Sequence, residues 1–131
     1  MNGAEPTPDA AAEADVLSRR GKNAWLRVAI AILFGLFYAY DLFEAISNTF
    51  GVTAQIASYN DTAASFGLDP VAVPWVVLVT GLLLPPVVYA GAYFIGRRWP
   101  VARLALVFLV GLALVAALTL SLTALAGVLA S

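Results

Sequence analysis

The stretch "FIGRRWPVARLAL", residues 94 to 106, joins two long apolar runs through a short basic connector. The run before the connector begins at Pro74 and ends at Gly96, and the run after it continues from Val101 to Ala130. A helix over either run can cross the roughly 30 Å hydrocarbon core of a bilayer once, and neither run is long enough to cross twice. Because the connector is so short, the two helices must be antiparallel neighbours, so the stretch predicts a transmembrane helical hairpin.

A third apolar segment precedes the hairpin and covers residues 24 to 50. As a helix it would be about 39 Å long, which is more than one crossing requires. The chain as a whole is 62% hydrophobic and 11% charged, far from the composition of soluble proteins. We therefore predict an all-α membrane protein in which residues 19–131 form one domain with three transmembrane helices, over residues 24–50, 74–96 and 101–130.

The N-terminal region permits two readings. Residues 1–18 are rich in Ala, Pro and acidic residues, and apart from Met1 they lack large apolar residues until Val16, which predicts a disordered acidic tail. The following basic cluster and apolar run, with Ala45 and Ser47 spaced as small residues, also resemble a cleavable signal peptide. The long leader and the bulky, acidic sequence "DLFE" at residues 41–44 favour a retained first span.

The basic residues indicate how the chain is threaded through the membrane. All seven lie either before the first span or around the connector of the hairpin: Arg19, Arg20, Lys22, Arg27, Arg97, Arg98 and Arg103. The positive-inside rule places both regions in the cytoplasm, so we expect the N-terminus inside and the C-terminus outside.

The expected outer loop, residues 51–73, contains no Lys or Arg. Within it, Ile56, Tyr59, Ala63 and Phe66 recur at helical spacing, and Gly67 supplies a stop. This pattern predicts a short amphipathic helix on the outer surface.

Two acidic residues stand near the outer end of the first span. Asp41, Glu44 and Asn48 are three and four residues apart, so they form one polar stripe on a helix. One interpretation is a helix end in contact with water. The other is an intramembrane polar layer, because Thr80 of the second span and Thr119 and Thr123 of the third span are expected at the same depth.

The second span contains two adjacent prolines, Pro85 and Pro86. Neither has an N–H to donate to the carbonyls of Gly81 and Leu82, and each ring clashes with the preceding turn, so we expect a kink there. Gly81 would ease the bend. The freed carbonyls need a donor within lipid, which a protonated Asp41 could supply. The kink serves either packing alone or a hinge.

Several kinds of chemistry are disfavoured by the sequence. The chain has no Cys and no His, which removes thiol catalysis, the usual zinc sites and imidazole proton relays. It contains no glycine-rich nucleotide loop and no Ser-His-Asp set. We therefore expect no enzymatic activity, no cofactor and no metal. The expected partners are the lipid bilayer and either another membrane protein or a second copy of the chain, and not nucleic acid.

The sequence "FGLFYAYDLFEAISN" in the first span, with "GRR" after the second, resembles small three-span membrane proteins of high-GC actinobacteria, some of them labelled bacitracin resistance proteins. The resemblance covers the chain from the first span to Arg98. It implies a three-span topology and a role in the envelope at the bacterial cell membrane, and it transfers no active residues.

Two hypotheses for function follow from the sequence. The first is a non-enzymatic envelope protein that packs against a partner or against itself. The second is an oligomeric proton- or cation-coupled transporter in which Asp41 or Glu44 titrates, because acidic residues within a membrane are functional candidates.

Overall fold

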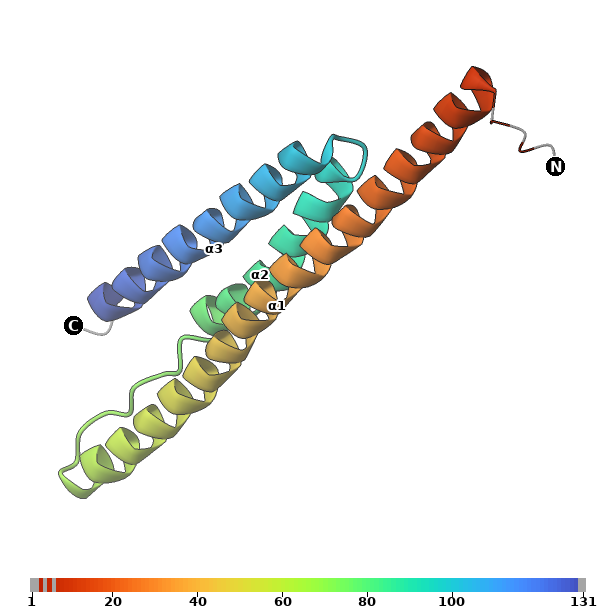
Figure 1. The fold of residues 1–131 in the computed structure, drawn as a ribbon. Helices are drawn as coiled ribbons and strands as arrows, with labels where there is room; N and C mark the ends of the chain where they lie inside the picture. Colours follow the sequence, from red (N-terminus) through yellow and green to blue (C-terminus); the bar gives the residue numbers. More distant parts are fainter. Residues whose placement is uncertain (1–2, 4, 6, 130–131) are drawn as a thin grey trace.

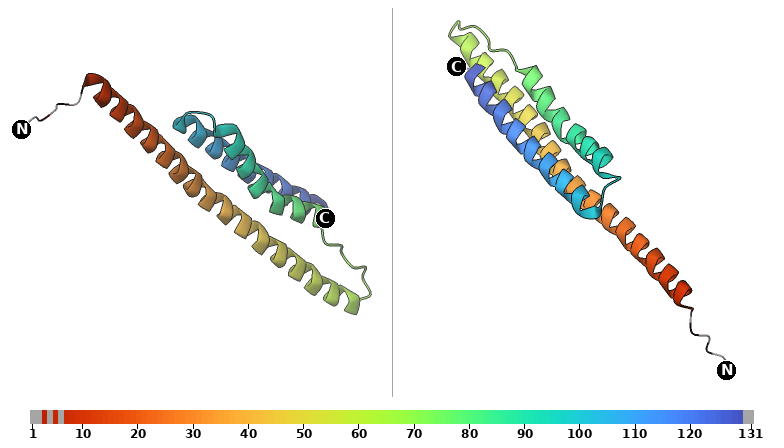
Figure 2. Two further views of the ribbon diagram at one scale, coloured as in Figure 1. Left: turned by 90° about the vertical axis from the view of Figure 1, so that its right-hand side faces the viewer. Right: turned by 90° about the horizontal axis from the view of Figure 1, so that it is seen from above.

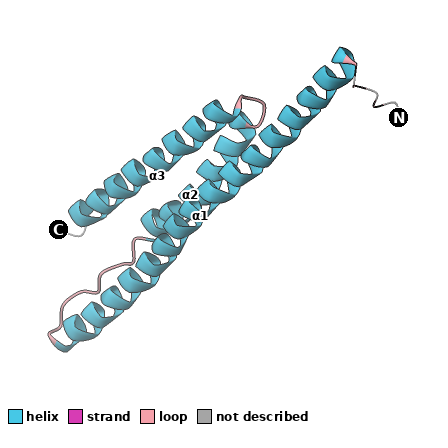
Figure 3. Ribbon diagram, viewed as in Figure 1, coloured by secondary structure: helices cyan, strands magenta, loops and turns pink. Residues whose placement is uncertain are grey.

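The computed structural model describes residues 3, 5 and 7–129 and is entirely helical over that part of the chain, apart from the connecting segments. Three helices follow one another, α1 (Pro8–Ser65), α2 (Trp75–Gly96) and α3 (Val101–Leu129), with no strand among the described residues (Figures 1 and 3). Each helix is long and apolar enough to cross a membrane. The prediction of an all-α, multi-pass membrane protein with three such helices is confirmed.

The helices are arranged as an antiparallel hairpin with a longer helix alongside it. In the left-hand view of Figure 2, α2 and α3 lie together and α1 runs along them. The first part of α1 projects alone beyond the turn that joins α2 to α3 (Figures 1 and 2). At the opposite end α1 again extends past α2, and the segment after it runs back to the start of α2.

The beginning of α1 differs from the sequence prediction. A disordered tail was expected over residues 1–18, whereas the helix begins at Pro8; residues 1, 2, 4 and 6 of that tail lie outside the described residues. Pro8 stands where its missing N–H is harmless, and Asp9 in the first turn suits the positive end of the helix dipole. The run is also rich in Ala, and Asp15 forms an ion pair with Arg19 one turn later at 3.0 Å. Because the span already nucleates this helix, the exposed residues need only to extend it.

The far end of α1 also differs from the prediction. The expected separate surface helix is the last part of α1, which continues to Ser65 and ends before Gly67 (φ 70°), the residue predicted as the stop. The chain then returns along α1, and the side-chain amide of Asn60 holds it. Asn60 Nδ2 donates to the carbonyl of Val71 at 2.9 Å, while Asn60 Oδ1 accepts from the N–H of Val71 at 2.7 Å.

The second helix, α2, continues through both internal prolines. Pro74 is its N-cap and Trp75 its first residue, one position later than predicted. Pro85 is fully buried, so its ring packs inside the bundle. With 22 residues α2 is about 33 Å long, which matches one crossing of the hydrocarbon core. The kink expected from Gly81, Pro85 and Pro86 stays a prediction.

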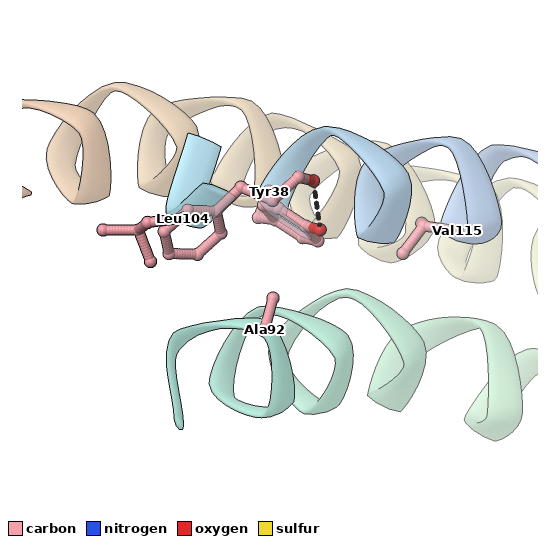
Figure 4. Close-up of a cluster of buried hydrophobic side chains, with 5 residues drawn as sticks. Tyr38, Ala92, Leu104 and Val115 are labelled. Carbon is pink, nitrogen blue, oxygen red and sulfur yellow. Dashed lines mark hydrogen bonds between the residues drawn. The ribbon is translucent and has the colours of Figure 1, made fainter. Parts of the chain in front are cut away.

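The core is small and lies between the three helices. Five buried residues form it, and all three helices contribute to it (Figure 4): Tyr38 from α1, Ala92 from α2, and Leu104, Phe108 and Val115 from α3. The aromatic rings continue this cluster, because Phe34 and Tyr89 both stack on Phe108 with centroids 5.3 Å apart. Most other large apolar side chains are exposed, as expected where lipid is the solvent.

Two tyrosine hydroxyls connect the helices through backbone carbonyls. Tyr38 on α1 donates to the carbonyl of Phe108 on α3 at 3.0 Å, the dashed line in Figure 4. Tyr89 on α2 donates to the carbonyl of Ala31 on α1 at 2.9 Å. A glycine lies beside each of these bonds. A Cβ at Gly111 would collide with the Tyr38 hydroxyl, and a Cβ at Gly35 would stand 3.3 Å from the Tyr89 hydroxyl. The absent side chains therefore permit both bonds.

A third connection lies at the basic end of the bundle. The guanidinium of Arg27 on α1 donates from Nη1 to the carbonyl of Arg97 at 2.6 Å and from Nη2 to the carbonyl of Trp99. Both carbonyls belong to the turn between α2 and α3, where the negative end of the α2 dipole favours a cation. Arg27 thus ties α1 to the hairpin.

Candidate functional site

The acidic stripe of α1 faces a groove between α1 and α3. Asp41, Glu44 and Asn48 follow one another at helical spacing and all line this groove, together with Thr119 from α3. Asp41 is half-buried, whereas Glu44 and Asn48 are exposed. The groove has a volume of about 310 Å³. One carboxylate therefore points between the helices while the other polar groups stand at the opening.

The base of the groove is formed by α2 and by the core side of α3. Gly81 and Pro85 contribute from α2 and Val115 from α3. Since Pro85 has no N–H, the carbonyl of Gly81 lacks the donor that a helix normally provides. The hydroxyl of Thr123 donates to the carbonyl of Thr119 at 2.9 Å. The hydroxyl of Thr119, in contrast, makes no hydrogen bond to its own helix in the described structure.

A smaller recess of about 80 Å³ continues the groove toward the start of α2. It shares Asn48, Gly81 and Thr119 with the larger groove and adds Thr123 and Thr49. The structure thus brings together five of the residues expected in the polar layer: Asp41, Glu44, Asn48, Thr119 and Thr123.

Thr80 does not belong to this layer. Its hydroxyl donates to the carbonyl of Val76 at 2.7 Å, and its side chain lies with those of Trp75, Val76 and Val79 on an exposed face of α2. The prediction placed Thr80 at the same depth as Asp41 but did not consider rotation about the helix axis. Successive helical residues differ by about 100°, so with Gly81 toward the groove its neighbour Thr80 points elsewhere.

The polar side chains of the groove have no partners within the part of the chain that the structure describes. Among residues 7–129, neither carboxylate, nor the amide of Asn48, nor the hydroxyl of Thr119 takes part in a hydrogen bond or an ion pair. Basic side chains are remote, because Asp41 lies about 21 Å along α1 from Arg27. The groove therefore presents oxygen and amide groups without positive charge, and can accept hydrogen bonds from a neighbouring helix or oxygen contacts from a cation.

The roles of several residues that hold the site in place were not predicted from the sequence. Tyr38 lies one turn before Asp41, and its bond to Phe108 fixes α1 against α3 directly below the groove. Gly111 leaves room for the Tyr38 hydroxyl at the same level, and Arg27 connects α1 to the hairpin at the basic end. A sequence signal existed for the glycine, because a Gly in an otherwise Leu- and Val-rich span indicates close approach of another element.

Comparison with known protein families, with curated proteins and with solved structures finds no match for this chain.

Proposed function

We propose that this protein is a non-enzymatic component of the bacterial cell membrane that binds a transmembrane helix of a partner, or of a second copy, in the groove at Asp41. The observation that supports this proposal best is the half-buried Asp41 carboxyl, which has no hydrogen-bond or ion-pair partner among the described residues. Polar groups at membrane depth are expensive unless paired, and hydrogen bonds between helices are one of the main ways to pair them.

The proposed orientation has the N-terminus and the α2–α3 turn in the cytoplasm. All seven basic residues lie in the first part of α1, in the α2–α3 turn or in the first turn of α3, and positive charge favours the cytoplasmic side. The groove then lies in the outer half of the membrane. The resemblance to small three-span actinobacterial proteins, some labelled bacitracin resistance proteins, supports an envelope role and makes bacitracin sensitivity a useful phenotype to measure.

Site-specific photo-crosslinking in cells tests the proposal directly. A photoreactive residue at Asn48, at the opening of the groove, should give a discrete adduct, whereas the same residue at Thr80 on the opposite face of α2 should not. Mass spectrometry of the adduct identifies the partner or a second copy. Equal yields from both positions would contradict a docking groove.

Asp41→Ala supplies the matched functional test. Because the Asp41 carboxyl makes no hydrogen bond or ion pair with any residue that the structure describes, we expect this variant to keep the thermal stability of the isolated protein and to lose the Asn48 adduct. Asp61→Ala, on the part of α1 beyond the groove, is the control and should change neither. A stability loss on the order of 1 to 3 kcal/mol for Asp41→Ala would instead indicate a buried partner within the chain.

A second function, proton- or cation-coupled transport by an oligomer, is favoured by one observation: the groove has two carboxylates and no basic side chain. The Asp41→Asn variant distinguishes coupled transport from helix binding in the groove. The amide still makes hydrogen bonds but cannot titrate, so association should persist while coupled uptake by reconstituted vesicles is abolished. Unchanged uptake in this variant would remove Asp41 from a coupling role.

A further inference from the structure

A second groove lies at the basic end of the bundle, between α1 and α2. Arg27 and Arg97 stand at its opening beside Tyr93, and its wall is apolar, with Val28, Ile32 and Leu104. Its volume is about 240 Å³. It is remote from the acidic groove, so what it binds is a separate question.

The charges at this end are not neutralised by the protein. Arg27, Arg97, Arg98 and Arg103 have no carboxylate partner, because the ion pair found among residues 7–129 joins Arg19 to Asp15. Arg97 instead lies 5.4 Å from the ring centroid of Phe94. Two of these guanidinium groups, those of Arg27 and Arg97, line the groove, and they favour phosphate, which arginine binds in a bidentate manner.

Arg27 is already oriented for such a contact. Its two bonds to the carbonyls of the α2–α3 turn fix the plane of the guanidinium, and they use two of its five N–H donors. The remaining N–H groups and the full positive charge stay available. A fixed donor loses little conformational freedom on binding, which favours affinity.

The apolar wall distinguishes between anions. Val28 and Ile32 are one turn apart and continue from the arginines toward the middle of α1, so the groove is charged at one end and apolar along its length. Inorganic phosphate would use the charged end alone. We propose that this groove is a binding site for an anionic phospholipid, with the phosphate at Arg27 and Arg97 and an acyl chain along Val28 and Ile32.

Native mass spectrometry of the full chain in detergent tests the assignment. Phosphatidylglycerol should remain bound at lower concentration than phosphatidylcholine. Arg97→Gln should weaken phosphatidylglycerol binding about fivefold, the effect of one basic residue at a membrane surface. Arg98→Gln removes the same charge one residue later but does not line the groove, so it should weaken binding clearly less than Arg97→Gln does.

Ile32→Trp provides a test that leaves every charge in place. The larger side chain fills the apolar wall and should weaken phosphatidylglycerol binding, even if Arg97→Gln fails to fold. The site is rejected by equal losses in Arg97→Gln and Arg98→Gln, by equal retention of the two lipids, or by unchanged binding in Ile32→Trp. Displacement of the lipid by inorganic phosphate would also reject it, because the anion alone would then account for binding.

Discussion

At the scale of single residues, two tyrosines and two glycines determine how closely the helices approach. The Tyr38 and Tyr89 hydroxyls each donate to a carbonyl of a neighbouring helix, beside Gly111 and Gly35 respectively. The carbonyl of Phe108 lies within α3, where the helix itself supplies a donor, so Tyr38 adds a second bond to it and leaves no orphan when removed. The stability of the bundle should therefore depend more on the close approach of the helices than on this hydrogen bond.

Gly111→Ala should destabilise the bundle by about 1 to 3 kcal/mol, because the new methyl group meets the Tyr38 hydroxyl and stands 3.1 Å from Val88 Cγ1. Tyr38→Phe alone should remove about 0.5 to 1.5 kcal/mol. The double variant should lose less than the sum, since removing the Tyr38 hydroxyl leaves room for the new methyl group, although Val88 keeps the rescue incomplete. Thermal unfolding in detergent measures all three.

The control for this cycle is Gly91→Ala, at a helical glycine where a Cβ meets no atom within 4 Å. It should be neutral or slightly stabilising, because Ala is the better helix former. Strict additivity between Gly111→Ala and Tyr38→Phe would contradict the proposed collision.

At the scale of elements, the helices are joined by side chains that bind the ends or turns of their neighbours. Asn60 holds the segment after α1 through both the N–H and the carbonyl of Val71. Arg27 does the same for the α2–α3 turn, with two carbonyls and one guanidinium. Both side chains reach backbone groups at distant sequence positions, so they determine where each loop lies against α1.

Arg27→Gln should lower stability by about 1 to 3 kcal/mol, because two hydrogen bonds from a charged donor to the α2–α3 turn are lost. Arg27→Lys should recover only part of this loss, since an ammonium group lacks the fork that reaches both carbonyls. The matched control is Arg19→Gln, whose exposed pair with Asp15 should contribute less than about 0.5 kcal/mol. Equal melting temperatures for Arg27→Gln and Arg19→Gln would argue against this connection.

At the scale of the whole molecule, the basic residues are confined to one end. They belong to the first part of α1, to the α2–α3 turn and to the first turn of α3, while the groove nearer the other end carries Asp41 and Glu44. If α2 crosses the membrane, its two ends lie on opposite sides, and the short turn then fixes the direction of α3. The orientation of one helix in the membrane therefore determines the orientation of the entire chain.

A reporter fused after Ser131 should be active outside the cell, and one fused after Ala102 should be active inside, as positive-inside threading requires. The opposite pattern would reverse the orientation while leaving the helical arrangement intact. Replacing Arg97, Arg98 and Arg103 with Asn should not invert the chain, because the basic cluster before the first span remains.

Sequence patterns predicted the parts of this molecule that depend on local composition. Apolar length and the "RRWP" connector predicted the hairpin, and helical spacing placed Asp41, Glu44 and Asn48 on one face. Thr80 was misplaced because depth along a helix can be counted, whereas its rotation depends on packing against neighbours. The start of α1 was missed because exposed residues with no core to join can still extend a helix that the membrane nucleates.

The length of α1 has a mechanical consequence. Its 58 residues form a rod about 87 Å long, nearly three times the thickness of the hydrocarbon core, and it is continuous from one overhang to the other. Such a rod acts as a lever whose pivot is the bundle. If α1 tilts as a rigid body about the bundle, its two overhangs move in opposite directions, and we expect such a tilt to be felt at both ends of the molecule at once.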